Sequence, residues 1–274
     1  MKKMLFILLF IFSFLVIGGI LSSLLGSRVW MIIFFPLSFI FLYMLIVTSA
    51  PLILHTLGAT PVDERIAPEV CEVVGRVSGE LGRQKPHIAI MPNAPPNAML
   101  ISSRDSYIVL TDEALSSFSE VEIEAIIIRT LASDAILKTW VCALGMIVGY
   151  PGFLGKGGYA KRMPQKLLGV VLLPFLFLAS FLESVFFSQS GIFDEDRKGA
   201  TIIGKPDMIA RVILLCEGAS KVKNPRRGNG SLSYLFLVPP YRDRVSDMFN
   251  FHPTSERRIS KLNEISKSMG REIV

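Results

Sequence analysis

The hydrophobic positions divide the chain into alternating apolar and polar stretches. Two uncharged stretches, Met4–Gly26 and Val29–Leu54, follow each other near the start and are separated by only two residues. Each is longer than the ~20 apolar residues needed to cross the hydrocarbon core of a bilayer. The pattern predicts a tight transmembrane hairpin over residues 1–58.

The basic start of the first stretch leaves a second interpretation open. Lys2 and Lys3 precede the apolar run, as basic residues do in a signal peptide. The run is longer than the usual ~7–15 apolar residues, however, and no small-residue cleavage site precedes Arg28. We therefore favour a helix that stays in the membrane.

A second and weaker apolar pair lies within residues 138–187. Thr139–Gly155 is short and rich in glycine, whereas Leu167–Phe187 is long enough but contains a proline and a glutamate. On length, the pair predicts two more spans, about four in total; the alternative is a buried or re-entrant hairpin. Four spans would place the polar segments 59–137 and 188–274 on one side of the membrane, where they can form one domain.

Basic residues give conflicting signals about orientation. Lys2 and Lys3 favour a cytoplasmic N-terminus and hence a cytoplasmic domain, but Gly155–Lys166 carries four positive charges on the opposite side. We expect the cytoplasmic arrangement. The mean hydropathy of +0.49 agrees with a mixed chain, since it is too high for an ordinary soluble domain.

The net charge of +6 arises mainly in the C-terminal part, where Lys221–Gly230 is strongly basic. A nucleic-acid-binding patch would bring aromatic residues or a recognisable motif, and this stretch has neither. We expect no nucleic-acid partner and interpret the stretch as a solvated loop, close to anionic lipid headgroups. The lipid bilayer is the partner that the composition predicts.

The segment 59–137 carries helix and strand patterns in turn. Ala67–Gly82 has valines at helical spacing, whereas His87–Pro92 and Ser106–Thr111 are strand-like runs with a turn-rich loop between them. With the apolar hairpins, this order predicts an α+β fold that is mostly helical and contains a small sheet.

The stretch Ser119–Ile136 has a strong helix-start signal. Ser119 and Glu122 form a capping box, and an apolar stripe at helical spacing follows it. The pattern predicts a helix of about 18 residues.

Five segments match motifs of one known family in the same order. They are Pro95–Ser102, Tyr107–Leu115, Ser119–Ile126, Asp194–Leu215 and Phe251–Leu262. Together they resemble the HtpX-like membrane zinc metallopeptidases, which are relatives of the CAAX prenyl proteases. The resemblance implies a zincin-like peptidase domain and places His252, Pro253 and Arg258 in the family's C-terminal motif.

This chain departs from the family at the zinc-binding and general-base positions. Where the family has its HExxH motif, with two zinc-binding histidines and a general-base glutamate, this chain reads Arg129–Thr130–Leu131–Ala132–Ser133. Arg129 and Ser133 replace the histidines and Thr130 replaces the base. Counting back from Asp196 places Ile192 where the family's third ligand, a glutamate, would lie. A guanidinium has no free acceptor and isoleucine has no donor atom, so no zinc or other cofactor is expected.

Other metal sites are weakly indicated. The chain's three histidines are His55, His87 and His252, and none lies four residues from another. The acidic run Asp194–Asp196 is a possible hard-cation site, although such runs are usually the solvated start of a helix.

The resemblance suggests how the missing charge is replaced. In related zinc peptidases the residue matching Asp196 supports the first zinc-binding histidine, whose place Arg129 takes. We predict a buried ion pair between Arg129 and Asp196, with Ile192 packed nearby, because a partly buried arginine needs a carboxylate. Asp196→Ala should then destabilise the domain far more than Glu195→Ala. The alternative is that Arg129 turns outward.

Three functions remain open on the sequence. The first is a non-catalytic pseudopeptidase that binds membrane-protein segments or an active relative at a sheet edge. The edge residues would be Asn97, Ala98, Met99, Leu100 and Ile101. The second is an active metallopeptidase with an atypical metal site, against which the absent ligands argue. The third is a membrane scaffold with no binding groove.

Overall fold

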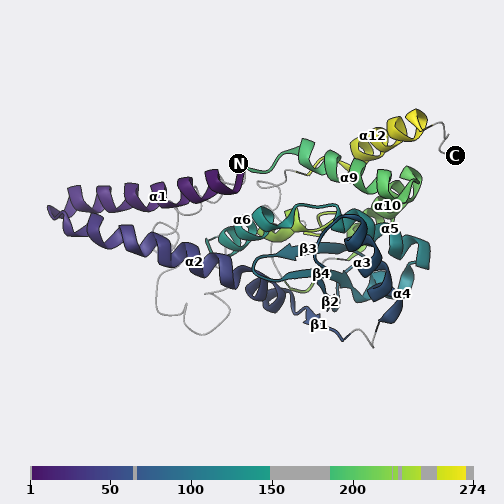
Figure 1. The fold of residues 1–274 in the computed structure, drawn as a ribbon, viewed down its shortest axis with the longest axis horizontal. Helices are drawn as coiled ribbons and strands as arrows, with labels where there is room; N and C mark the ends of the chain where they lie inside the picture. The colour runs from purple at the N-terminus through teal and green to yellow at the C-terminus, as the bar shows by residue number, and fades with distance from the viewer. Residues whose placement is uncertain are drawn as a thin grey trace.

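The computed structural model describes residues 2–63, 67–148, 186–223, 225–227, 230–241 and 252–269. Two long helices, α1 (Lys2–Leu25) and α2 (Val29–Leu57), form a hairpin that projects from one end of the molecule (Figure 1). Both are long and apolar enough to cross a membrane. Their outward-facing side chains, such as Phe12 and Ile32, are large, apolar and exposed, as lipid-facing side chains are.

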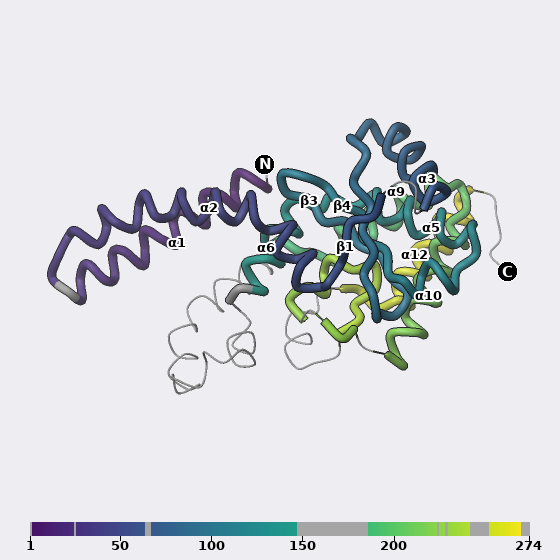
Figure 2. The backbone as a smooth tube through the Cα atoms, turned by 90° about the horizontal axis from the view of Figure 1, so that it is seen from below, coloured from purple at the N-terminus to yellow at the C-terminus, as the bar shows by residue number. Residues whose placement is uncertain are grey.

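The remaining elements form a body of helices and one sheet at one end of the hairpin (Figure 2). Its helices are α3 (Pro68–Glu80), α4 (Asp112–Ser117), α5 (Glu120–Leu131), α6 (Ala135–Val148), α9 (Gln189–Ile203), α10 (Pro206–Val222) and α12 (Ser255–Ser268), with a 3-10 helix η1 (Gly230–Leu235). The fold is therefore a mostly helical α+β arrangement with a small sheet, as the sequence predicted.

The sheet has four strands in the order β1-β2-β4-β3. They are β1 (Thr60–Pro61), β2 (His87–Met91), β3 (Ala98–Ser102) and β4 (Ser106–Thr111). The strands β2 and β4 are parallel, whereas β1 with β2 and β3 with β4 are antiparallel, so the sheet is mixed. Both strand runs predicted from the sequence are confirmed, and β3 lies at the outer edge.

Alternation along the strands gives each face of the sheet its own core. Ala89, Met91, Met99, Ile101 and Val109 join a cluster with side chains of α1, α2, α6 and η1. Ile88, Ala98, Leu100, Ile108 and Leu110 join a second cluster with side chains of α3, α5, α9 and α10. The first core therefore continues from the sheet into the apolar hairpin.

The helix predicted over Ser119–Ile136 is shorter than expected. Its start is as predicted, since the Ser119 N–H donates to Glu122 Oε2 at 2.9 Å in a capping box. It ends at Leu131, where Arg83 Nη1 donates to the carbonyl oxygens of Leu131 and Ser133, at 2.8 and 2.7 Å. Arg83 thus satisfies carbonyls that a continuing helix would have used, and the chain turns into α6.

The predicted second membrane hairpin lies largely outside the described residues. Its first part is α6, whose residues Val141, Cys142 and Ala143 are fully buried in the first core. This burial is typical of a core helix. The stretches 149–185, including most of Leu167–Phe187 and the basic Gly155–Lys166, are not among the described residues.

Candidate functional site

The C-terminal end of α5 packs closely against α9 at Gly199. A Cβ atom on Gly199 of α9 would lie 3.1 Å from the Arg129 Cα atom on α5. Glycine therefore allows the two helices to approach without displacing Arg129. One turn earlier on α9, Glu195 and Asp196 face the end of α5.

The four positions that match the family's zinc ligands and base gather around one small cavity. Arg129, Thr130, Ser133 and Ile192 all line it, together with residues of β3, η1 and His252. The cavity measures about 10 Å³, which is about the space of one water molecule. The structure thus brings together residues that the sequence separates widely, as the resemblance implied.

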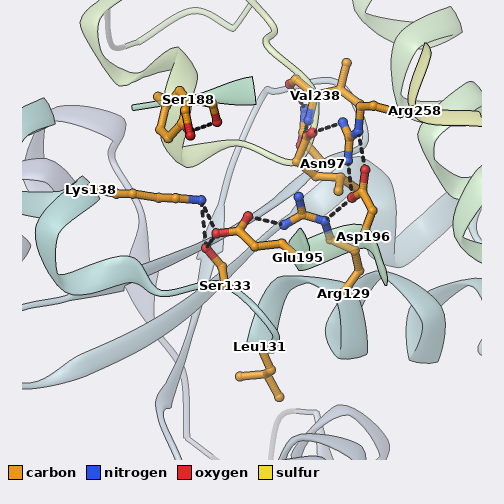
Figure 3. Close-up of polar contacts among 12 residues, drawn as sticks. Asn97, Arg129, Leu131, Ser133, Lys138, Ser188, Glu195, Asp196, Val238 and Arg258 are labelled. Carbon is orange, nitrogen blue, oxygen red and sulfur yellow. Dashed lines mark hydrogen bonds and ion pairs between the residues drawn. The ribbon is translucent and has the colours of Figure 1, made fainter. Parts of the chain in front are cut away.

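The Asp196 carboxylate accepts hydrogen bonds from two buried arginines, Arg129 and Arg258 (Figure 3). Arg129 Nε lies 2.8 Å from Asp196 Oδ1. Arg258 holds both carboxylate oxygens, with Nε 2.7 Å from Oδ2 and Nη2 2.7 Å from Oδ1. The side chains of Arg129, Asp196 and Arg258 are 6%, 3% and 1% exposed. The predicted pair therefore lies within a larger buried arrangement, and Arg129 points inward.

Glu195 completes this arrangement from the next position of α9. Its Oε2 lies 3.0 Å from Arg129 Nη1. Its Oε1 accepts from Lys138 Nζ at 2.5 Å and from Ser133 Oγ at 2.9 Å. We call Arg129, Lys138, Glu195, Asp196 and Arg258 the ion-pair network. Three basic groups and two carboxylates share it, so positive charge is in excess at the centre.

Both carboxylates are held ionised by this network. Burial by itself would raise the pKa of Glu195, but the charges of Lys138 and Arg129 outweigh burial and lower it to about 2. Burial likewise opposes ionisation of Asp196, and the guanidinium groups of Arg258 and Arg129 lower its pKa to about 2. Charged hydrogen bonds in a low-dielectric interior explain both shifts.

The acidic run differs from the solvated helix start that its composition suggested. It lies within α9, where Asp194 is 54% exposed and pairs with Arg197, whereas Glu195 and Asp196 are buried. The roles of Lys138 and Arg258 in this arrangement were not predicted from the sequence. A lysine at the start of an apolar stretch could have signalled Lys138, since a cation in such a place needs a partner.

The residues around the cavity do not fit a zinc ion. Arg129 brings a fixed positive charge, Ile192 brings only hydrocarbon, and the Ser133 hydroxyl is already engaged. Within the described ranges, no group of three or more His, Cys, Asp or Glu side chains is placed to hold a metal ion. Zinc sites in proteins use three or four such ligands.

The histidines lie in three different places. His55 is exposed in the last turn of α2, and His87 begins β2 with its ring 5.4 Å from that of Tyr107. His252 lies beside the cavity, edge-on to the Tyr234 ring at 5.1 Å. Burial, and then the charge of Arg258, lower the pKa of His252 well below its usual value, so this imidazole is neutral.

The predicted peptide-binding edge is covered by the chain itself. Every residue of β3 is buried. Phe236 forms an antiparallel bridge with Met99, and the Leu237 N–H donates to the Ala98 carbonyl oxygen at 2.9 Å. Asn97, just before the strand, is fully buried. We call Phe236–Val238 the edge-covering segment.

Comparison with known proteins identifies relatives along most of the chain, although no family model matches it. A protein named Protease HtpX homolog from Pyrococcus abyssi is 29% identical over 270 residues, covering 91% of each chain. Its namesake from Pyrococcus furiosus is 28% identical, again covering 91% of each. A third, from Methanocaldococcus jannaschii, is 26% identical and covers 81% of this chain and 84% of its own.

Among solved structures, the crystal structure of S. mikatae Ste24p is similar, with a TM-score of 0.49 and 14% identity. The match covers 91% of this chain, which spans about three fifths of that structure, 61% of its length. The relatives named above and the ordered motifs agree, and two helices of the chain are apolar enough to cross a membrane. The chain is therefore a homologue of the HtpX-like membrane proteases.

Proposed function

We propose that this chain is a pseudopeptidase: a zincin-like homologue in which the ion-pair network stands where active relatives would hold zinc. The observation that carries the proposal is the position of Arg129, whose guanidinium lies between Asp196 and Glu195 at 2.8 and 3.0 Å. Ile192 occupies the third-ligand position with an apolar side chain that is 1% exposed.

The chemistry of these positions argues against peptide hydrolysis. A zinc peptidase needs a metal that activates water and a general base that takes the proton. A guanidinium at the centre repels a divalent cation, because it stays protonated at every physiological pH. Thr130, which stands for the base, is buried and its hydroxyl cannot act as a base near neutral pH. The lining therefore favours a structural role for the centre.

The proposal includes a membrane location and topology. The apolar helices α1 and α2, together with a second hairpin within residues 138–187, would make the chain a multi-pass membrane protein of about four spans. Its body would lie on the cytoplasmic side, next to the basic Lys2 and Lys3. There it would bind extended segments of membrane proteins, or an active relative, at the β3 edge.

One observation favours a second candidate, a membrane scaffold with no binding groove. The edge-covering segment occupies β3, and the cavity beside it measures only about 10 Å³. A groove that is permanently filled could not accept a peptide. The two candidates differ in whether the edge-covering segment can leave β3.

We expect no peptidase activity from the natural chain. The purified full chain in detergent, supplied with zinc, should leave β-casein uncut, and the Pyrococcus furiosus protein named Protease HtpX homolog is assayed beside it for comparison. The readout is the loss of intact casein on a gel, with a chelator-treated sample of each protein as the control. Casein cleavage by the natural chain that zinc restores and the chelator abolishes would refute the pseudopeptidase proposal.

A further inference from the structure

The strand β3 has an outer edge on which backbone groups can pair with another segment. In the order β1-β2-β4-β3 it lies last, with β4 on one side only. An unpaired edge of this kind is a template for an additional strand, supplied by another chain or by the same chain. In this molecule the chain supplies it.

The edge-covering segment pairs with β3 as a short antiparallel strand would. Phe236 lies opposite Met99, and the Leu237 N–H donates to the Ala98 carbonyl oxygen. The Asn97 side chain continues the pairing, since its Nδ2 donates to the Val238 carbonyl oxygen at 2.7 Å (Figure 3). The Val238 N–H in turn lies 3.3 Å from Asn97 Oδ1. An amide side chain thus binds both backbone groups of one residue, as a peptide group of a strand does.

The side chains of this segment fill both cores beside the edge. Phe236 is 2% exposed and belongs to the core shared with the apolar hairpin. Leu237 and Val238 are 3% and 4% exposed and belong to the core around α5 and α10. Phe236 and Leu237 thus enter opposite cores, as consecutive side chains of an extended polypeptide do, whereas Val238 joins the same core as Leu237.

A single side chain ties this segment to the ion-pair network. Arg258 Nη1 donates to the Leu237 carbonyl oxygen at 2.7 Å. The other two nitrogens of the same guanidinium, Nε and Nη2, hold Asp196. Because Asp196 also binds Arg129, the carboxylate at the centre of the site fixes the arginine that holds the segment.

We propose that Phe236–Val238 is an intramolecular occupant of a polypeptide-binding edge, and that Arg258 latches it to the ion-pair network. The edge takes an extended polypeptide, in antiparallel pairing with Asn97–Met99, when this segment leaves. The inference rests on the proposed binding function and adds its regulation: the buried charges that stand at the zinc positions also keep the binding edge closed.

Two variants of the full chain test this in opposite directions. Leu237→Pro removes the N–H that donates to Ala98 and leaves every residue of β3 intact. The pair Met99→Cys and Phe236→Cys should form a disulfide across the bridge, because antiparallel neighbours lie within disulfide range. The native Cys71, Cys142 and Cys216 are all buried. The reduced and oxidised forms of the second variant are matched controls for each other.

The probe is a labelled peptide with the sequence of Ser231–Val238, SLSYLFLV, bearing a solubilising lysine tail; fluorescence anisotropy measures its binding. We expect Leu237→Pro to bind it about fivefold to tenfold more tightly than the natural chain, as the loss of one backbone hydrogen bond predicts. Amide hydrogen exchange at 232–241 should accelerate by a similar factor, while α5 and α9 keep their protection. The oxidised cysteine variant should bind least and regain binding on reduction.

Equal peptide binding by the oxidised and reduced cysteine variant would overturn the inference, and this comparison does not depend on how Leu237→Pro folds. Faster exchange in the segment without peptide binding by any form would refute the binding edge, and with it the binding part of the proposed function. Tightly held zinc or casein cleavage would refute the pseudopeptidase proposal separately, because neither involves the probe peptide.

Discussion

Asp196→Ala should lower the free energy of unfolding by roughly 3–5 kcal/mol, the range found when one partner of a buried ion pair is removed. The reason is that Arg129 and Arg258 both lose an acceptor, and their side chains are only 6% and 1% exposed. Thermal or denaturant unfolding of the full chain in detergent gives the difference.

Asp194→Ala is the matched control. Asp194 lies two positions earlier on α9, is 54% exposed and forms a surface pair with Arg197. Its removal should change the free energy of unfolding by less than about 1 kcal/mol, as is usual for exposed pairs. Equal and small losses for the two alanine variants would contradict a buried centre built on Asp196.

The structure changes the expectation for Glu195→Ala. The sequence led us to expect a much smaller effect at this position than at Asp196. Glu195 is instead buried and binds Arg129, Lys138 and Ser133. Its removal should therefore cost an amount comparable with that of Asp196→Ala.

Stability should also fall steeply in acid. The pKa values of Glu195 and Asp196 are lowered to about 2 in the folded chain, below the ordinary values of 4.5 and 3.8. A carboxylate with a lowered pKa contributes stability that is fully present above its unfolded pKa and is lost as the pH falls toward the folded value. We expect a loss on the order of a few kcal/mol between about pH 5 and pH 2.

The double variant Glu195→Gln, Asp196→Asn isolates this effect, since it keeps the side-chain shapes but cannot titrate there. Its unfolding free energy should depend much less on pH between 5 and 2. His252 adds an earlier loss that both proteins should share: its folded pKa is lowered, so acid favours the unfolded chain already below about pH 6.5. Parallel curves for the two proteins below pH 5 would contradict the ionised state of the network.

Much of the fold could be predicted because local patterns decide it. The apolar runs near the N-terminus coincide with α1 and α2, and the strand-like runs coincide with β2 and β4. The capping box set the start of α5 within one residue. The end of α5 was not predicted. The Leu131 carbonyl oxygen there accepts from Arg83, which lies far away in sequence, so no local pattern signals the contact.

Residues of the candidate site could be predicted where a family motif fixed their spacing along the chain. The spacing within the motifs led to Arg129, Ile192 and Asp196, and the structure places them together. Glu195 carries no such signal, since an acidic run is an ordinary feature of a solvated helix. Lys138 lies outside the matched motifs, although a lysine at the start of an apolar stretch needs a partner. The pairing of β3 with Phe236 could not be predicted either, because η1 and Phe236 lie more than a hundred residues beyond the strand.

A count of bound zinc in the natural protein tests whether the ion-pair network replaces a metal centre. The full chain would be purified in detergent without added chelator, and metal per chain measured by mass spectrometry. A variant carrying Arg129→His, Thr130→Glu, Ser133→His and Ile192→Glu provides the comparison. We expect no bound zinc in the natural chain and about one zinc per chain in the variant, as a three-ligand site should hold. One tightly held zinc in the natural chain would contradict the replacement of a metal centre by the ion-pair network.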